Sequence, residues 1–328
     1  MKSKVLASCL ALSLAWAAGL TSAGLAAGYP DRPVTLVLPN SAGGGLDLIA
    51  RNMAVVLQEQ TGQPFIIDNR PGALGEIGER YVAESKPDGY TLLFQNNSLV
   101  TRPAVMENRR FKLGEKLVGV AALVTVPSGL AVHPSIPANS VEELYAYIRA
   151  NPGKHFAYSS CGTGSSIHLI GELLKHVEKV ENVEHVSYNG CGPGIADALG
   201  GHVPIAFNSV AGMVQHAQAG TLRLLGVTRK IDIEGVKNNI EVFADLPGME
   251  LARDADVWSG VFAPVGTPPE LIERINEVFA KAASDPRILE YFKKGFQVPL
   301  KMTPKEFTDY VNFDFQRWHK IGTRKFDD

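Results

Sequence analysis

Short apolar runs alternate with helix-like patterns along most of the chain, and this alternation constrains the fold more than any other feature. Residues 34–38 read VTLVL, residues 65–69 read FIIDN and residues 90–96 read YTLLFQN, with an amphipathic pattern after each of the first two. Apolar strands separated by helices are typical of a mainly parallel sheet that is covered on both faces. The sequence therefore predicts an α/β fold.

The same alternation restarts near residue 131, which predicts a second α/β unit. The sequence SVEE at residues 140–143 is a capping box that opens a helix. After a long strand pattern at residues 256–265 the chain is mainly helical, so we expect it to return to the first unit. The expected crossover strands are residues 129–134 and 260–265. The expected domains are residues 28–130 together with 247–328, and residues 131–246.

Residues 1–27 have the pattern of a secretory signal peptide. Lys2 and Lys4 form a basic head, Val5–Leu20 is apolar, and small residues follow. These flanks and this length are wrong for a membrane span. We expect cleavage near residue 26 or 27 and export to the periplasm. No later stretch is apolar enough to span a bilayer, which predicts a soluble mature protein.

Two cysteines remain after the expected cleavage, Cys161 and Cys191, and each lies in a glycine-rich loop after a predicted strand. An oxidising compartment favours a disulfide between them. Two buried thiols are the alternative. A disulfide that closes a loop of about 30 residues would contribute roughly 3–4 kcal/mol of stability.

Glycine-rich loops after three predicted strands are the main functional signal. They read PNSAGGGLD (39–47), CGTGSSIH (161–168) and YNGCGPG (188–194). In open α/β sheets, ligands bind where strands lead into helices. A helix N-terminus offers unpaired N–H groups and partial positive charge, and glycine removes the Cβ that would keep an anion away. The loops therefore predict a carboxylate or phosphate site built from backbone, although a tight turn alone would explain any one of them.

The sequence also excludes several other functions. The net charge is −2 and no Lys/Arg block occurs, so we expect no nucleic-acid partner. There is no P-loop, no GxSxG elbow and no HExxH, and we expect no cofactor and no metal. One alternative is a metal site on the helix that carries His168, Glu172 and His176. A second alternative is a hydrolase that uses Ser165 or Ser166 with His168, although no orienting carboxylate accompanies them.

With these loops in place, the chain resembles the periplasmic solute receptors of tripartite tricarboxylate transporters, also called Bug receptors. The resemblance covers nearly the whole mature chain. It is carried by YPDRPVTLVLPNSAGGGLDLIAR, IIDNRPGALGEIG, PDGYTLLF, CGTGSSIHLIGELL, HVSYNGCGPGIADALGGHV and WSGVFAPVGTPPELIERIN. It implies a two-domain clamshell of the periplasmic-binding-protein type without catalytic activity, in which a carboxylate is held between loops of both domains.

The resemblance assigns ligand-binding roles to loop residues. In the first domain these are Ser41, Ala42, Gly43, Gly44 and Asp47, and in the second Thr163, Gly164, Ser165, Ser166, His168 and Tyr188. Four strand-end residues are added on the same cleft: Asn96, Asn97, Asn208 and Ser209. Asn40 replaces a residue that is commonly bulky and often aromatic in the family, so we expect a more polar or roomier pocket. The cleft loops contain no Arg or Lys, which favours a carboxylate over a phosphate.

The resemblance therefore predicts a monomeric receptor that closes over a small organic carboxylate and delivers it to integral-membrane transporter subunits. An alternative is a sensing receptor that presents its closed form to a membrane sensor kinase. The sequence leaves this choice open.

Overall fold

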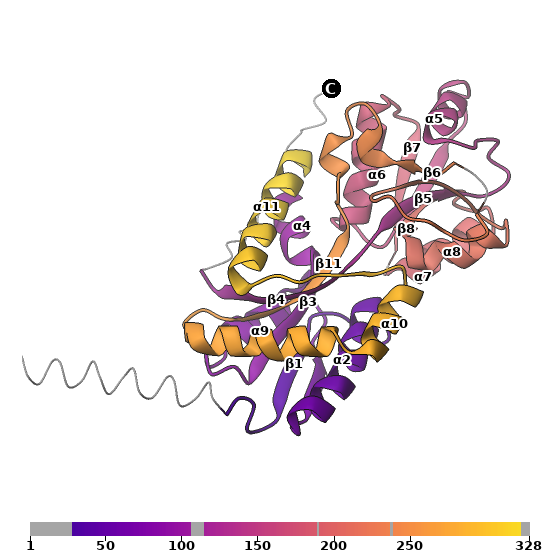
Figure 1. Cartoon of the computed structure of the whole chain (residues 1–328). Helices are drawn as coiled ribbons and strands as arrows, with labels where there is room; N and C mark the ends of the chain where they lie inside the picture. Colours follow the sequence, from indigo (N-terminus) through magenta and orange to yellow (C-terminus); the bar gives the residue numbers. More distant parts are fainter. Residues whose placement is uncertain (1–27, 106–114, 189, 237–238, 323–328) are drawn as a thin grey trace, which may run out of the picture.

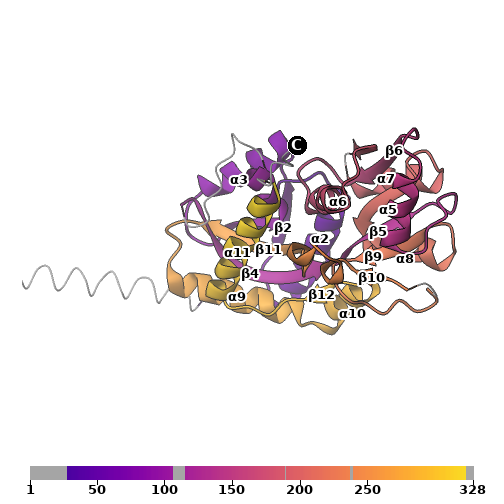
Figure 2. The same cartoon turned by 90° about the horizontal axis from the view of Figure 1, so that it is seen from above.

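Two six-stranded sheets lie in two lobes of the computed structural model, which describes residues 28–105, 115–188, 190–236 and 239–322 (Figures 1 and 2). The strand order is β12-β4-β11-β3-β1-β2 in one sheet and β10-β9-β5-β8-β6-β7 in the other. We call the elements from β1 to β4 and from β11 to α11 the first lobe. The elements from β5 to η3 form the second lobe. The predicted signal peptide lies outside the described residues.

The elements of the first lobe are β1 (Val34–Leu38), α2 (Gly45–Thr61), β2 (Phe65–Asn69), η1 (Ala73–Gly75), α3 (Glu76–Ala83), β3 (Thr91–Asn96), α4 (Ser98–Val105), β4 (Leu117–Val126), β11 (Val257–Pro264), α9 (Pro269–Ala283), α10 (Pro286–Lys294), β12 (Val298–Pro299) and α11 (Pro304–Gly322). Those of the second lobe are β5 (Ser128–Val132), α5 (Val141–Arg149), β6 (Phe156–Ser160), α6 (Ser166–Val177), β7 (Val183–Ser187), α7 (Cys191–Leu199), β8 (Ile205–Ser209), α8 (Val210–Gln218), β9 (Arg223–Val227), β10 (Glu241–Val242), η2 (Phe243–Asp245) and η3 (Glu250–Ala252).

Local sequence signals explain where several helices begin and end. Helix α2 ends at Gly62, whose φ of 74° is in the left-handed region that glycine tolerates. The predicted capping box of α5 is confirmed, because Ser140 Oγ accepts the Glu143 N–H at 3.0 Å. At α11 the box is reciprocal: Thr303 Oγ1 accepts the Glu306 N–H at 3.2 Å, and Glu306 Oε2 accepts the Thr303 N–H at 2.8 Å.

Both sheets are mixed, because the strands next to the lobe crossings run antiparallel to their neighbours. Strand β4 ends at Val126 and β5 begins at Ser128, so the chain passes from one sheet to the other across Pro127 alone. The strand expected at residues 129–134 is therefore a crossing strand, and it belongs to the second sheet. The strand expected at residues 260–265 lies inside the first sheet as β11, paired antiparallel with β3 and β4.

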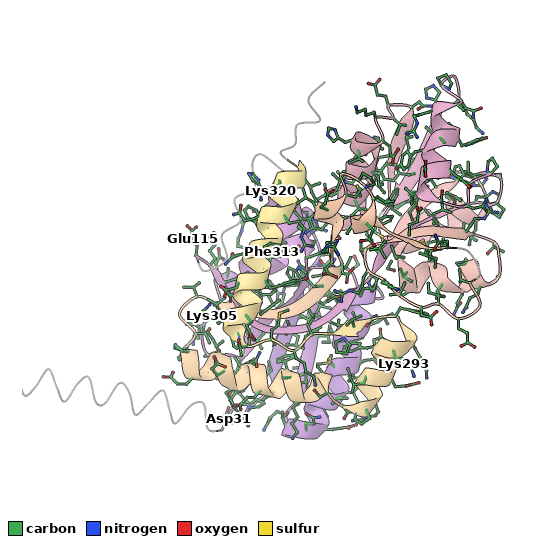
Figure 3. All side chains as sticks on the ribbon, turned by 45° about the horizontal axis from the view of Figure 1, so that its top comes forward. Asp31, Glu115, Lys293, Lys305, Phe313 and Lys320 are labelled. Carbon is green, nitrogen blue, oxygen red and sulfur yellow. A yellow bond between two sulfur atoms is a disulfide. The ribbon has the colours of Figure 1, made fainter. Side chains whose placement is uncertain are left out.

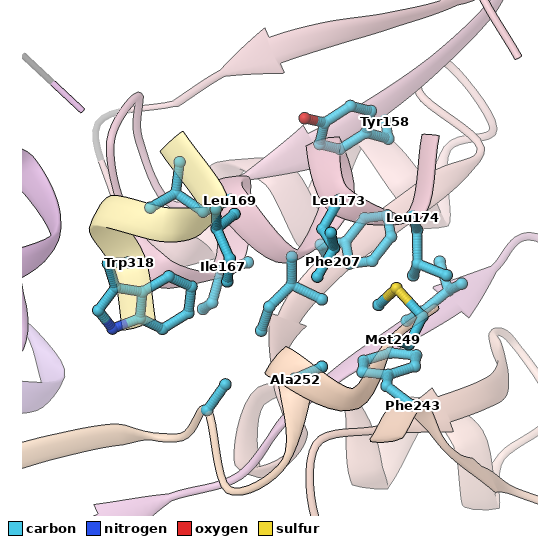
Figure 4. Close-up of a cluster of buried hydrophobic side chains, with 14 of the residues drawn as sticks. Tyr158, Ile167, Leu169, Leu173, Leu174, Phe207, Phe243, Met249, Ala252 and Trp318 are labelled. Atoms are coloured by element: carbon cyan, nitrogen blue, oxygen red, sulfur yellow. The ribbon is translucent and has the colours of Figure 1, made fainter. Parts of the chain in front are cut away.

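The two lobes share one cluster of buried hydrophobic side chains. Figure 4 shows Trp318 of α11 beside Ile167 and Leu169 of α6, with Ala252 of η3 below them. Trp318 and Ala252 are completely buried, and Ile167 and Leu169 are almost so. This packing holds the C-terminal helix of the first lobe against the helix that follows a candidate binding loop.

The outer helices of the first lobe carry exposed lysines as well as an exposed phenylalanine, Phe313. Figure 3 labels Lys305 and Lys320 on α11 and Lys293 on α10. Lys305 pairs with Asp309 one turn further along α11, at 2.6 Å. Within the ranges described, no helix has both the length and the apolar character that a membrane crossing requires.

Candidate ligand-binding site

The loop after β1 leaves the start of α2 without a side-chain cap in the described structure. Gly44 is the N-cap, and Gly43 has a φ of +84°, which favours glycine. Residues 41–45 are all exposed, so Ser41 and Ala42 lie on the surface beside the three glycines. Gly45, the first residue of this 17-residue helix, is therefore exposed at the helix end that carries partial positive charge, whereas the next two residues, Leu46 and Asp47, are buried.

Asp47 braces this loop from inside. Its carboxylate accepts the Gly43 N–H at 2.9 Å, Arg51 Nε at 2.8 Å and Asn69 Nδ2 at 3.0 Å. The residue is only 1% exposed. The hydrogen bond from Arg51 is the largest of the effects that lower the pKa of Asp47 to about 2. An ionised carboxylate thus holds Gly43 of the loop in place, and the ligand-binding role expected for Asp47 stays a prediction.

A histidine braces the second-lobe loop in a similar way. Ser165 caps α6, because its Oγ accepts the His168 N–H at 3.2 Å and donates to the Gly162 carbonyl at 2.7 Å. The Gly164 N–H, at a φ of +76°, donates to His168 Nδ1 at 3.3 Å. Burial is the main cause that lowers the pKa of His168 to about 4, and the charge on His185 is the second. The ring centroids of the two histidines are 4.1 Å apart. The imidazole is therefore neutral near pH 7 and can accept this hydrogen bond.

These contacts do not form a hydrolase site. The bond between Ser165 and His168 uses the backbone N–H of the histidine, so the ring does not activate the hydroxyl. Ser166 is 2% exposed and lies within the first turn of α6. Thr163 is exposed, and its N–H and hydroxyl both donate to Ser187 Oγ, at 2.9 and 3.0 Å. The loop is thus arranged by hydrogen bonds among its own residues and the adjacent strand.

The second and third glycine-rich loops are joined covalently. The disulfide links Cys161 to Cys191, the pairing that the sequence favoured, with the two Cα atoms 4.3 Å apart. The Tyr188 hydroxyl donates to the Asp197 carboxylate, and burial followed by this bond raises the pKa of Tyr188 to about 12. Asn208 Nδ2 donates to the Cys191 carbonyl at 3.0 Å. The polar groups near these loops therefore hold the loops in position.

Three further predicted residues also have internal partners. Asn208 Oδ1 accepts the Ser209 N–H at 2.8 Å, at the start of α8. Asn96 Oδ1 accepts the Ser98 N–H at 2.9 Å, at the start of α4. Asn97 is 3% exposed, and its Nδ2 donates to the Asp256 carbonyl at 3.1 Å. Asn97 thus links the end of β3 to the segment that re-enters the first lobe.

Arg102 on α4 lies between the loops of the two lobes, and sequence reasoning missed it. A Cβ added at Gly164 would be 3.5 Å from Arg102 Cγ and 3.7 Å from Val105 Cγ2. A Cβ added at Gly75 would be 3.1 Å from Arg102 Nη1 and 3.5 Å from Pro39 Cβ, at the start of the first loop. A cationic side chain is therefore near both loops, although the loops themselves contain none. The available signal was the polar run NNS at residues 96–98, which joins the end of β3 to the start of α4.

The other groups weighed from the sequence have ordinary structural partners. Glu172 accepts hydrogen bonds from the Tyr158 hydroxyl at 2.5 Å and from Lys175 Nζ at 3.1 Å. Among the described residues, no group of three His, Cys, Asp or Glu side chains is placed to hold a metal ion. The carbonyl of Asn40 accepts Asn69 Nδ2 at 3.1 Å, which ties the first loop to the end of β2.

Comparison with known proteins agrees with this geometry. The family described as "Tripartite tricarboxylate transporter family receptor" matches residues 49–325. Protein BugT of Bordetella pertussis is 32% identical over 303 residues, covering 92% of this chain and 91% of that protein. A Pseudomonas sp. (strain P51) protein encoded between tcbD and tcbE is 34% identical over 313 residues, covering 94% and 91%.

A solved structure shows that the similarity to known proteins includes the fold. The structure described as R. palustris Rpa4515 with adipate is 30% identical, covers 90% of this chain and 97% of its own, and superposes with a TM-score of 0.77. The sequence match and the two-lobe architecture thus agree over nearly the whole described chain. The chain belongs to the family of tripartite tricarboxylate transporter receptors, which are periplasmic solute-binding proteins.

Proposed function

We propose that the protein is a periplasmic receptor that binds a small organic carboxylate between its lobes and delivers it to the membrane subunits of a tripartite tricarboxylate-type transporter. One observation carries the proposal. The first-lobe loop presents an uncapped helix N-terminus, and the second-lobe loop around Gly164 packs against α4 of the same first lobe. A carboxylate needs only a few N–H and hydroxyl donors, and such a loop provides them.

Lobe closure is the step that would connect binding to delivery. A ligand that contacts both loops favours the conformation in which they are close together. Asp47 accepts the Gly43 N–H and His168 accepts the Gly164 N–H, so the backbone of each loop is held in place before a ligand arrives. Preorganised donors of this kind reduce the ordering cost of binding. The family match supports this role, and the adipate in the R. palustris structure is consistent with a carboxylate ligand.

Thermal unfolding and calorimetry test the proposal directly. The mature protein would be titrated with linear mono-, di- and tricarboxylates and with aromatic acids, and with inorganic phosphate as the anion control. A ligand that binds only the folded state at one hundred times its Kd adds about 2.7 kcal/mol to stability, and the melting temperature rises. At least one carboxylate should produce this shift and a binding heat. A panel without shift or heat would contradict the proposal.

Delivery to a transporter needs its own measurement. Deletion of the chromosomal gene should abolish uptake of the radiolabelled ligand found by calorimetry, and the gene in trans should restore it. Normal uptake in the deletion strain, together with loss of a ligand-dependent transcriptional response, would instead support the sensing alternative.

A further inference from the structure

The Cys161–Cys191 disulfide lies where the second sheet meets two of the glycine-rich loops. Cys161 directly follows β6, and Cys191 is the first residue of α7, which comes after β7. Strands β6 and β7 are adjacent and parallel, with Ser160 paired with Ser187 at their carboxyl ends. Ligands of open α/β sheets bind beyond these strand ends. The covalent bond therefore joins the two loops at the place where the candidate site lies.

The other contacts between these two loops are few within the described structure. The N–H and hydroxyl groups of Thr163 donate to Ser187 Oγ, at 2.9 and 3.0 Å, and both hydrogen bonds are exposed. Such bonds replace bonds to water, so their net contribution to stability is modest. A Cβ added at Gly162 would be 3.5 Å from the Tyr188 carbonyl oxygen, which is an ordinary van der Waals contact. The disulfide is thus the strongest link between the described parts of the loops.

The start of α7 has little else to hold it. Gly190 precedes the helix with a φ of 103° and provides no side-chain cap. A Cβ added at Gly190 or at Gly192 would meet nothing within 4 Å outside the local backbone, so no side chain packs against these positions. One hydrogen bond, from Asn208 Nδ2 to the Cys191 carbonyl at 3.0 Å, would remain without the disulfide. Because glycines have a wide conformational range, release of Cys191 would let this segment move relative to Cys161.

Both cysteines are partly exposed, so a thiol reagent can approach the bond between them. One thiolate of a dithiol reductant attacks a cysteine Sγ, forms a mixed disulfide and releases the other cysteine as a thiolate. The second thiol of the reductant then displaces the first cysteine. The protein gains two electrons and two protons and ends with two thiols, while the reductant leaves as a disulfide. Cys9, the remaining cysteine of the sequence, lies in the predicted signal peptide, so dithiol reduction of the mature protein should act on this pair alone.

We propose that the Cys161–Cys191 disulfide positions the two loops for ligand binding, so that the oxidised protein binds its carboxylate more tightly than protein reduced by a dithiol. The cysteines are positioning residues, because they act through the loop backbone. In the reduced protein the loops must be ordered when the ligand binds, and fixing the backbone of a single residue is enough to weaken binding about tenfold. This inference rests on the proposed function, because it concerns the affinity of the same site.

Thermodynamic linkage gives a readout that a merely structural disulfide would not affect. If the oxidised form binds the ligand more tightly, the bound ligand makes the disulfide harder to reduce by the same factor. For this two-electron couple, a tenfold ratio of affinities corresponds to about 30 mV. The midpoint reduction potential should therefore become at least about 30 mV more negative when the ligand is present at a concentration above both dissociation constants.

Calorimetry and redox titration test the inference on the mature protein. The carboxylate panel described above, with adipate, malate and citrate among its members, would be titrated into oxidised protein, into protein reduced with dithiothreitol, and into protein that has been reoxidised. At least one acid should bind the oxidised form about tenfold or more tightly than the reduced form, and reoxidation should restore its affinity. The midpoint potential would be measured in dithiothreitol buffers with and without that acid.

Two variants separate loop positioning from stability. Cys161→Ser with Cys191→Ser should bind like the reduced protein and should not respond to dithiothreitol. Ile148→Ala removes a completely buried side chain from α5, which leads into the amino end of β6, and should destabilise the second lobe while retaining the wild-type affinity. Circular dichroism checks folding. A form that unfolds in buffer is compared with the oxidised protein in sucrose, which favours the folded state.

The outcomes distinguish this inference from the function on which it rests. Equal affinities of the oxidised and reduced protein, or an unchanged midpoint potential, would overturn the inference and leave the receptor function standing. An equal loss of affinity in Ile148→Ala and in the double serine variant would also overturn it, because the loss would then follow stability. Absence of binding of every carboxylate to the oxidised protein would contradict the proposed function itself, and this inference with it.

Discussion

Removal of the Asp256 side chain should destabilise the protein more than any other single carboxylate change near the lobe crossing. Asp256 Oδ2 accepts Thr125 Oγ1 and Arg229 Nε, both at 2.8 Å, and Oδ1 accepts Thr228 Oγ1 at 2.5 Å. The side chain is 0% exposed. Thr125 lies on β4 of the first lobe, whereas Thr228 and Arg229 follow β9 of the second. One carboxylate therefore bonds to both lobes.

The size of the effect follows from what the substitution leaves behind. Asp256→Ala leaves two buried hydroxyl groups without this acceptor, and Arg229 without its buried partner. Breaking a buried ion pair by removing one partner costs about 3–5 kcal/mol. In a chain of this size each kcal/mol lowers the melting temperature by roughly 2 °C, so differential scanning calorimetry should show a decrease of about 6–10 °C.

Asp254→Asn is the matched control, because Asp254 has a φ of 50° that asparagine tolerates and alanine does not. Asp254 also pairs with Arg229, at 3.1 Å, but its side chain is 54% exposed, so its loss should cost about 1 kcal/mol or less. A double-mutant cycle of Asp256→Ala with Arg229→Ala should give a coupling energy of more than about 1 kcal/mol. If Asp256→Ala and Asp254→Asn shifted the melting temperature equally, the argument from the buried network would be refuted.

Three further outcomes are expected. Gly44→Leu should abolish carboxylate binding in calorimetry, and unchanged affinity would place the ligand elsewhere. The stability cost should be about 1 kcal/mol or less, because an added Cβ would meet only the Ser41 carbonyl, at 3.7 Å, and the φ of Gly44 is −77°. The unfolded chain takes up a proton at His168 near the usual pKa of 6.5, whereas the folded pKa is about 4. Stability should therefore fall by up to about 3 kcal/mol between pH 6.5 and pH 4, and His168→Gln should flatten this part of the melting-temperature profile. Cys161→Ala opens a closed loop with a sequence separation of 30 and should cost about 3–4 kcal/mol in denaturant titrations; no change would mean that the unfolded chain gains little freedom from the opening.

The elements that could be predicted from the sequence are those with strong local signals. Helix α2 begins at the last of three glycines and ends before Gly62, and the capping box of α5 lies where it was expected. Helix α4 was not predicted, because Pro103 lies inside it and proline normally breaks a helix. Helix α8 was also missed, since its nine residues include Gly212 and give a weak pattern.

The roles of the site residues could be predicted less well than their positions. Asp47 was expected at the ligand, and the hydrogen bond that it accepts from Asn69 at the end of β2 was not foreseen, because a contact between separate elements is not visible in a local motif. Arg102 was missed for the related reason that its neighbours, Gly75 and Gly164, are separated from it by 27 and 62 positions. Such relations depend on how the lobes pack together.

Strand β11 lies between β4 and β3 in the first sheet but follows the whole second lobe in the sequence, so the first sheet can be completed only after the second lobe has been synthesised. The second lobe is encoded by one continuous stretch, so a growing or translocating chain can assemble it while the first sheet still lacks an interior strand. Until residues 257–264 arrive, β3 and β4 have no partner between them, and each exposes an unpaired edge. Premature termination before residue 257 should therefore yield an intact second lobe attached to an aggregation-prone half-sheet.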